Sequence, residues 1–239
     1  MGRLVLGQRG LGSRGQEEPD PHNPAAMDEL MQGNGPQIVG IAGGSCAGKT
    51  WLAERLFEAF AGEAVQISLD NFYLDRSHLS VGRRARLNFD HPRAIDWPAF
   101  EQVLRRCAAR ERVSLPLYDF ATHARVAGES VCESASLVVV EGLWLFRQPA
   151  IRDLLTFKIF IRAPQGLCVE RRVARDTRER GRTHEEVMTQ WKHFTLPMFE
   201  RFVAPQERWA DVILEAPVSA SEVSQLRNRI AEKLCAYGI

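Results

Sequence analysis

One glycine-rich segment restricts the fold more than any other feature of the sequence. Residues 43–50 read GGSCAGKT and fit the pattern G-x-x-x-x-G-K-[ST], directly after the apolar run Ile38–Ala42 and before an amphipathic stretch. In such a segment glycines let backbone N–H groups turn inward around phosphate oxygens, and the helix that follows adds its positive N-terminal dipole. A lysine reaches the β- and γ-phosphates and a hydroxyl ligates Mg²⁺, the roles predicted here for Lys49 and Thr50. The predicted nucleotide-binding residues are Gly43, Gly44, Ser45, Cys46, Ala47, Gly48, Lys49 and Thr50.

Short apolar runs alternate with amphipathic stretches from Gln37 onward, which is typical of a parallel sheet with crossover helices. The runs are uniformly apolar, so we expect strands buried on both faces. The predicted strands are Ile38–Ala42, Ala64–Ser68, Leu137–Val140, Lys158–Ile161 and Asp211–Leu214. Apolar residues three or four positions apart predict core-facing helices between them, one capped by Asp96 and the last beginning near Ser221. The sequence therefore predicts an α/β fold with a doubly wound parallel sheet of the P-loop NTPase type.

Two segments depart from this alternation. Residues 1–36 are rich in Gly, Pro, Asn, Gln and Glu without an apolar period, which predicts a disordered N-terminal arm. Met27 is a second candidate start of the chain. Residues 113–131 read as two short strands joined by Asp119–His123, which predicts a β-hairpin inserted beside the main sheet. We therefore expect one domain over residues 37–239, preceded by the arm.

Composition and missing motifs exclude several classes of protein. The 31 Lys and Arg residues nearly balance the 30 Asp and Glu residues, which argues against a protein that coats nucleic acid. No stretch approaches the roughly 20 apolar residues of a membrane helix, and the five scattered cysteines predict free thiols in a reducing cytoplasm. A GTPase switch requires an Asn-Lys-x-Asp motif, and the sequence contains no Asn-Lys pair. A remodelling ATPase fits poorly, because no arginine-finger interface is evident.

Two acidic residues follow predicted strands and are candidates for the chemistry. Glu141 comes directly after Leu137–Val140, and Asp70 comes just after Ala64–Ser68. In an open α/β sheet, ligands gather at the carboxyl ends of the strands. We therefore predict Thr50, Glu141 and Asp70 as metal ligands, and Asp70 as an acceptor of a proton from a hydroxyl group. The alternatives are that Asp70 caps the next helix and that Glu141 is an ordinary loop acid.

Further motifs follow in a fixed order. They are Ser68-Leu69-Asp70-Asn71-Phe72-Tyr73, Asn88-Phe89-Asp90-His91-Pro92, Leu115-Pro116-Leu117-Tyr118-Asp119-Phe120 with His123 and Arg125, Glu141-Gly142, and the arginine-rich stretch from Arg171 to Arg182. In order and approximate spacing, these motifs closely resemble those of the uridine kinase (uridine-cytidine kinase) family of P-loop kinases. The resemblance runs from about Ile38 to Leu214.

This resemblance implies phosphorylation of the 5′-hydroxyl of uridine or cytidine to the monophosphate by ATP and Mg²⁺, a step of pyrimidine salvage. It implies Asp70 as general base, with Lys49 and Arg175 also catalytic, and Arg175 and Arg180 in a lid over the phosphates at about residues 165–190. The implied nucleoside-binding residues are Tyr73, Asp90, Tyr118, Phe120, His123, Arg172 and Gln190. A homo-oligomer, of tetramer type, is also implied by the resemblance, and the composition adds the expectation of a cytoplasmic protein with no nucleic-acid or membrane partner. The sequence leaves the choice between ATP and GTP open.

Several alternatives stay open at this point. Tyr118 and Phe120 could be core aromatics of the hairpin. The six arginines from Arg171 to Arg182 could form a solvated helical face, with Asp176 and neighbouring glutamates as partners. Relatives of this architecture phosphorylate other alcohols, including phosphoribulose, pantothenate and nicotinamide riboside, and a non-catalytic ATP-binding module is a further alternative.

Overall fold

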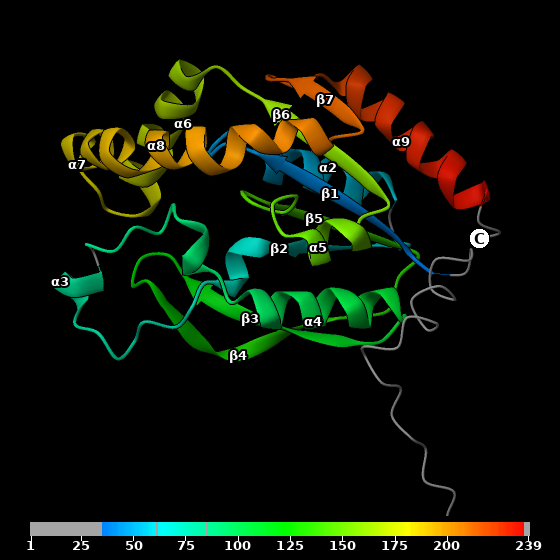
Figure 1. The fold of residues 1–239 in the computed structure, drawn as a ribbon, viewed down its shortest axis with the longest axis horizontal. Helices are drawn as coiled ribbons and strands as arrows, with labels where there is room; N and C mark the ends of the chain where they lie inside the picture. The colour runs from blue at the N-terminus through cyan, green and yellow to red at the C-terminus, as the bar shows by residue number, and fades with distance from the viewer. Residues whose placement is uncertain (1–34, 61, 85, 237–239) are drawn as a thin grey trace, which may run out of the picture.

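The computed structural model describes residues 35–60, 62–84 and 86–236, so nearly all of the predicted arm lies outside the described residues. Within these residues a parallel sheet with strand order β2-β5-β1-β6-β7 forms the centre of the molecule (Figure 1). The strands are β1 (Gln37–Gly43), β2 (Ala64–Ser68), β5 (Leu137–Gly142), β6 (Phe157–Arg162) and β7 (Val212–Glu215). Each predicted strand is confirmed to within two residues at either end.

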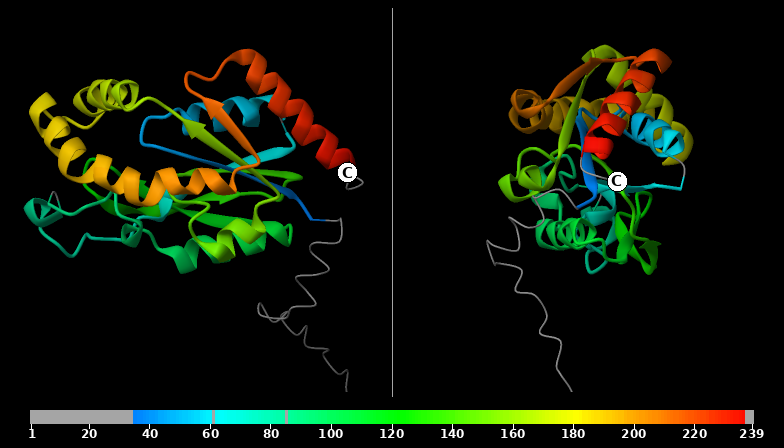
Figure 2. Two further views of the ribbon diagram at one scale, coloured as in Figure 1. Left: turned by 45° about the horizontal axis from the view of Figure 1, so that its top comes forward. Right: turned by 90° about the vertical axis from the view of Figure 1, so that its right-hand side faces the viewer.

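Helices cover both faces of this sheet, as Figure 2 shows in its two views. On one face lie α2 (Lys49–Ala59) and α9 (Ala220–Ala236), and on the other lie α4 (Trp97–Ala108) and α5 (Pro149–Leu154). Successive residues of β1 point to opposite faces: Ile41 packs in the cluster that includes α2 and α9, and Ala42 in the cluster that includes α4. The doubly wound α/β fold is therefore confirmed, and it accounts for the burial of every residue of β1.

The hairpin is confirmed as an antiparallel pair apart from the main sheet, β3 (Val113–Asp119) and β4 (Ala124–Cys132). Its register shifts between Pro116 and Leu117, where proline cannot donate a ladder hydrogen bond. Strand β3 packs against α4 and against η1 (Leu69–Phe72), a 3₁₀ turn that follows β2. This packing brings the hairpin turn to the η1 end of the molecule (Figure 1), and Phe120 and His123 of the turn line one cavity together with Asp70 of η1.

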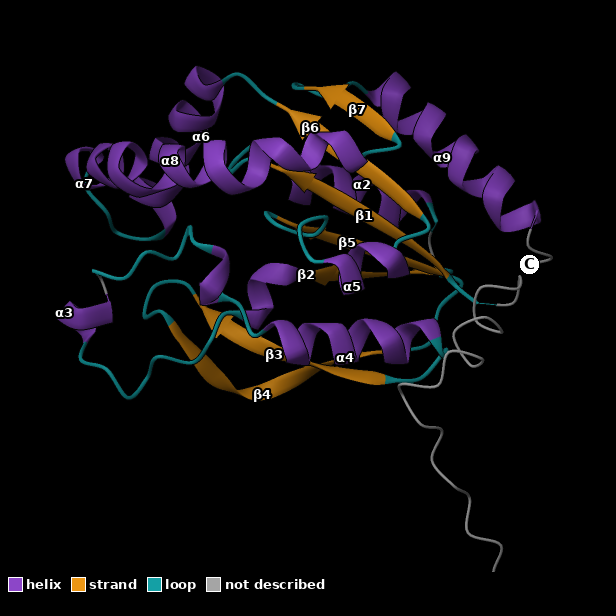
Figure 3. Ribbon diagram, viewed as in Figure 1, coloured by secondary structure: helices purple, strands orange, loops and turns teal. Residues whose placement is uncertain are grey.

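The remaining helical segments lie near the carboxyl edge of the sheet or, for residues 196–209, along the face that carries α4 and α5 (Figure 3). They are α3 (Val81–Arg84), η2 (Pro92–Ala94), α6 (Gln165–Glu179), α7 (His184–Gln190), η3 (Trp191–Thr195), α8 (Leu196–Met198), η4 (Phe199–Val203) and η5 (Ala204–Trp209). None of the helices among the described residues has the length and apolarity needed to cross a bilayer.

Several side chains outside the site have local structural roles or lie at the surface. The Asp96 side chain accepts a hydrogen bond from the backbone N–H of Ala99, so it caps α4 as expected. His91 accepts a hydrogen bond from the N–H of Arg93 and so acts as a turn residue. His184 and His193 are exposed. The cysteines for which the structure gives a state are free thiols: Cys46, Cys107, Cys132 and Cys168.

Candidate active site

The glycine-rich loop connects β1 to α2 at the carboxyl edge of the sheet. Gly48 adopts a φ of 107°, in the left-handed region that glycine enters at little cost, and α2 starts at the next residue. The Lys49 side chain is buried, and its Nζ donates a hydrogen bond to the Gly44 carbonyl at 2.8 Å. Residues 45–50 line a cavity of about 970 Å³, whereas Gly43 and Gly44 do not line it.

Asp70 and Glu141 lie at neighbouring strand ends and also line this cavity. The parallel register of β2 and β5 sets Ser68 opposite Glu141, and the Ser68 hydroxyl donates to Glu141 Oε1 at 2.6 Å. The same hydroxyl accepts from the Asp70 N–H at 3.3 Å, so Ser68 rather than Asp70 caps the turn. A Cβ on Gly142 would stand 2.5 Å from Leu69 Cβ, so only glycine lets this turn lie against β5.

Glu141 is buried and Asp70 is half-buried, so the charged forms of both carboxyl groups are disfavoured. Burial raises the pKa of Asp70 above its ordinary value, against the lowering effect of Lys49 and of the nearby arginines. Burial and the Asp70 charge likewise raise the pKa of Glu141, which also receives a hydrogen bond from Thr50. Asp70 Oδ1 is buried and finds no hydrogen-bond partner among the described residues. Asp70 is thus poised to take up a proton.

The same residues suit a hard cation. Mg²⁺ prefers oxygen ligands and keeps several ligands from water or phosphate. Asp70, Glu141 and Thr50 offer carboxylate and hydroxyl oxygens at one side of the cavity, including the unpaired Asp70 Oδ1. No group of three or more His, Cys, Asp or Glu residues suited to a metal occurs among the residues that the structure describes. A cation here would therefore complete its ligand set with phosphate oxygens.

Aromatic side chains of the hairpin form the opposite end of the cavity. The Tyr118 ring lies 5.2 Å from Tyr73 and 5.3 Å from Phe120, and His123 stacks on Phe89 at 4.2 Å and 8°. Tyr118 belongs to the apolar core of the hairpin and also lines the cavity, so its place in the core does not keep it out of the site. Its hydroxyl finds no partner within the described part of the chain.

The His123 ring is neutral near pH 7. Burial and the charge of Arg182 lower the pKa of His123 to about 4, so one ring nitrogen is an acceptor, and Arg182 donates to Nε2 at 3.1 Å. The Tyr118 hydroxyl stays protonated, because burial raises its pKa to about 12. This end of the cavity therefore offers flat apolar surfaces with neutral polar groups at their edges, which suits a planar heterocycle.

Arg172 connects the two ends. It is buried on α6, and its guanidinium lies 3.1 Å from Asp90 Oδ1 and 3.3 Å from the Ser45 hydroxyl. The Thr195 hydroxyl also donates a hydrogen bond to Asp90, at 2.9 Å. The Arg172–Asp90 ion pair is therefore held by Ser45 of the glycine-rich loop on one side and by Thr195 of η3 on the other.

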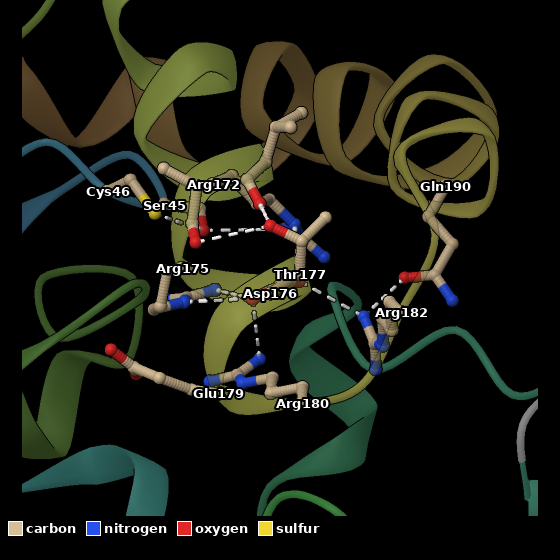
Figure 4. A network of polar contacts seen from close by, with 12 residues as sticks. Ser45, Cys46, Arg172, Arg175, Asp176, Thr177, Glu179, Arg180, Arg182 and Gln190 are labelled. Carbon is tan, nitrogen blue, oxygen red and sulfur yellow. Dashed lines mark hydrogen bonds and ion pairs between the residues drawn. The ribbon is translucent and has the colours of Figure 1, made fainter.

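Arg175, Arg180 and Arg182 of this stretch surround Asp176 (Figure 4). Arg178 instead faces solvent beside Glu179, with 77% of its side chain exposed, and Arg171 donates a hydrogen bond to the Cys46 carbonyl at 3.3 Å. The alternative of a solvated face fails for Asp176, because its side chain is fully buried. It also fails for Arg182, because α6 ends at Glu179 and Gly181, with a φ of 63°, turns the chain back. Arg182 instead lies 2.7 Å from Gln190 and 3.1 Å from His123 Nε2.

The similarity of the chain to known proteins shows its family. The model of the phosphoribulokinase/uridine kinase family matches residues 38–223. The chain belongs to this family. Uridine kinases from Shewanella frigidimarina and Deinococcus deserti are 35% and 37% identical to it, over 74% and 75% of this chain and 86% and 87% of theirs. The fold resembles that of the phosphoribulokinase from Rhodobacter spheroides, with a TM-score of 0.57 and 18% identity over 75% of this chain and 70% of the other.

Some cavity residues of this family member were not predicted from the sequence. Trp51 and Glu54 on α2 line the cavity beside the glycine-rich loop, together with Pro217 and Val218 from the segment after β7. Trp51 is 42% exposed, although a large aromatic side chain is usually buried. Phe89, Arg182 and Leu143 also line the cavity. The sequence offered signals for two of them: Trp51 directly follows Thr50, and Phe89 lies within the Asn88–Pro92 motif.

Proposed function

We propose that the protein transfers the γ-phosphoryl group of ATP to the 5′-hydroxyl of uridine or cytidine, giving the nucleoside monophosphate and ADP. One observation carries this proposal. The half-buried Asp70, whose carboxylate Oδ1 is buried and unpaired, lines a single cavity that has the glycine-rich loop at one end and the aromatic hairpin at the other. The relatives named uridine kinase support a nucleoside as the acceptor.

Asp70 is the general base of this reaction. The 5′-oxygen attacks the γ-phosphorus, the bond from that phosphorus to the bridging oxygen of ADP breaks, and the hydroxyl proton passes to Asp70. The raised pKa of Asp70 makes it a stronger base than an ordinary carboxylate, and Lys49, Arg175 and Arg180 offset charge on the phosphates. Mg²⁺, held through Thr50, Glu141 and Asp70, would supply further charge neutralisation.

The acceptor lies at the hairpin end. Tyr118 and His123 face the edge of the pyrimidine with their unpaired or neutral polar atoms, and Phe120 and Tyr73 pack around it. Asp90, Arg172 and Gln190 hold the ribose hydroxyls through charge-assisted hydrogen bonds. Because the base is read by neutral groups, uridine and cytidine are both accepted.

The base of the donor lies at the other end. Trp51, Pro217 and Val218 extend the cavity past the glycine-rich loop and give a purine an apolar surface. Stacking on an aromatic ring discriminates weakly between bases, so GTP also serves as a donor. The segment 165–190, which carries α6 and α7, acts as a lid that closes over the bound phosphates. A cytoplasmic homo-oligomer remains our prediction.

A panel of acceptors tests the function. The protein is incubated with Mg-ATP and uridine, cytidine, phosphoribulose, pantothenate or nicotinamide riboside, and ADP release is followed. We expect rapid release with the two pyrimidine nucleosides only. Strong release with phosphoribulose and none with either nucleoside would refute the proposal, and ADP release that no acceptor accelerates would indicate an ATP-binding module.

A further inference from the structure

Asp176 lies at the centre of the arginine group and has no part in the proposed chemistry. It stands near the C-terminal end of α6, and its side chain is 0% exposed. Each of its carboxylate oxygens faces two guanidinium groups (Figure 4). Oδ1 lies 2.9 Å from Arg175 and 3.5 Å from Arg180, and Oδ2 lies 3.2 Å from Arg182 and 3.6 Å from Arg172.

The main chain of the same residue holds the turn that carries two of these arginines. The Asp176 carbonyl accepts hydrogen bonds from the backbone N–H groups of Arg180 and Arg182, each at 3.2 Å. The turn between them depends on Gly181, whose φ of 63° reverses the chain. Asp176 therefore fixes both the backbone position of this turn and the direction of its side chains.

The arginines need such a counter-charge. Four guanidinium groups within 3.6 Å of one carboxylate repel one another, and long side chains without a partner lose little by turning into solvent. Burial alone would raise the pKa of Asp176, but Arg175, Arg180 and Arg172 outweigh it and hold the pKa below its ordinary value. The carboxylate is thus ionised at neutral pH.

The positioned groups reach both ends of the cavity. Arg172 contacts Asp90 and Ser45, Arg182 contacts His123 and Gln190, and Arg180 lies 5.0 Å over the Phe120 ring. Arg175 and Arg180 also act on the charge of Asp70. Asp176 itself is not among the residues that line the cavity. It can therefore act on bound substrates only through the arginines.

We propose that Asp176 is the positioning residue of this arginine group, and that its carboxylate holds the guanidinium groups toward the cavity in the arrangement that phosphoryl transfer requires. The inference rests on the proposed function, because the arginines it positions are those that offset the charge of the transferred phosphoryl group. Asp176 would thus affect both the donor and the acceptor through the arginines, without contacting either substrate.

The first test compares Asp176→Asn with Glu170→Gln. The first change removes one charge at nearly constant shape, and the second removes an exposed acid from the same helix. We expect kcat to fall about 100-fold or more in D176N, in line with losing a preorganised charge clamp, and to stay within about 2-fold of the parent in E170Q. Wild-type kcat in folded D176N would overturn the inference.

Chemical rescue separates positioning from a merely structural role. Asp176→Ala leaves room for a small carboxylate among the four guanidinium groups. We expect formate to restore kcat of D176A by about 10-fold or more, while chloride at equal ionic strength restores nothing. Folded D176A that formate does not rescue would assign Asp176 a structural role only. If neither neutral variant folds, Asp176→Glu decides: a kcat about 10-fold below wild type supports positioning, and an unchanged kcat contradicts it.

Binding of inorganic tripolyphosphate gives a test that needs no acceptor. Removing a negative charge near an anion site should tighten binding if only net charge matters. Positioning predicts the opposite sign, with D176N binding tripolyphosphate at least about 5-fold more weakly than the parent in calorimetry. Equal or tighter binding would overturn the inference. If the wild-type protein were inactive on nucleosides, the proposed function would be refuted, but tripolyphosphate binding would still test the role of Asp176.

Discussion

The two ends of the cavity are built in different ways. The loop end comes mainly from one continuous segment, residues 45–54, whose backbone conformation follows from glycines and a helix start. The hairpin end gathers side chains from η1, the segment before η2, the β3–β4 turn, the end of α6 and α7. A local motif can therefore specify donor binding, whereas acceptor binding depends on the packing of distant segments. Substitutions at the loop end should act on the donor alone, and those at the hairpin end on the acceptor alone.

Asp70→Asn should have the largest effect, because Asp70 lies where the two ends meet. The amide cannot take up the hydroxyl proton, so we expect kcat to fall about 1,000-fold, within the range of general-base losses. The affinity for ADP, measured by calorimetry, should change less than about 3-fold because the loop is intact. A variant that keeps near-native kcat would remove Asp70 from the role of base.

His123→Ala should break the acceptor end without touching the donor end. The substitution removes the stack on Phe89 and one polar group at the edge of the base. We expect KM for uridine to rise about 30- to 100-fold, from the loss of one hydrogen bond and one stacking contact. KM for ATP serves as the internal control and should stay within about 2-fold. A parallel rise in both constants would contradict the separation of the two ends.

Trp51→Ala should give a smaller loss at the donor end. Loss of one stacking surface should weaken ADP binding about 5- to 30-fold while leaving the affinity for tripolyphosphate unchanged, because the latter has no base. Phe57→Ala is the matched control: Phe57 lies on the same helix at 41% exposure, close to the 42% of Trp51, but does not line the cavity. If the two variants bind ADP equally well, the donor base does not lie on Trp51.

Asp70→Asn should also make the folded protein slightly more stable, although it lowers the activity. The pKa of Asp70 is raised in the folded state, so its contribution to stability is present at low pH and is lost as the pH rises through that value. At pH 7 the neutral amide should therefore raise Tm, by about 2–4 °C for each kcal/mol gained. The difference in Tm between variant and parent, followed by calorimetry in the absence of ligand, should close as the pH is lowered toward 4 and below. If the variant had a lower Tm than the parent at pH 7, that result would contradict a raised pKa of Asp70 in the folded state.

The sequence predicted those features that depend on neighbouring residues. The strands, the caps, the hairpin and the glycine-rich loop follow from local periodicity and turn chemistry, and the motif comparison placed Asp70, Tyr118 and His123 at one site. The alternative of a solvated arginine face fails for Arg182 because α6 ends at Glu179 and Gly181 turns the chain, and it fails for Asp176 because arginines enclose the carboxylate. Trp51 was passed over because its exposure depends on how α2 packs. Charge pattern alone cannot distinguish a solvated acid from one enclosed by four arginines.

The identity of the product tests the central claim most directly. The protein is incubated with Mg-ATP and uridine, and phosphorus and proton NMR follow which atom gains phosphate. We predict one uridine 5′-monophosphate for each ADP formed, and loss of both products together in Asp70→Asn. ADP that accumulates without a phosphorylated nucleoside, or phosphate on a different hydroxyl group, would contradict the claim that the loop end and the hairpin end meet at Asp70 to phosphorylate the 5′-hydroxyl.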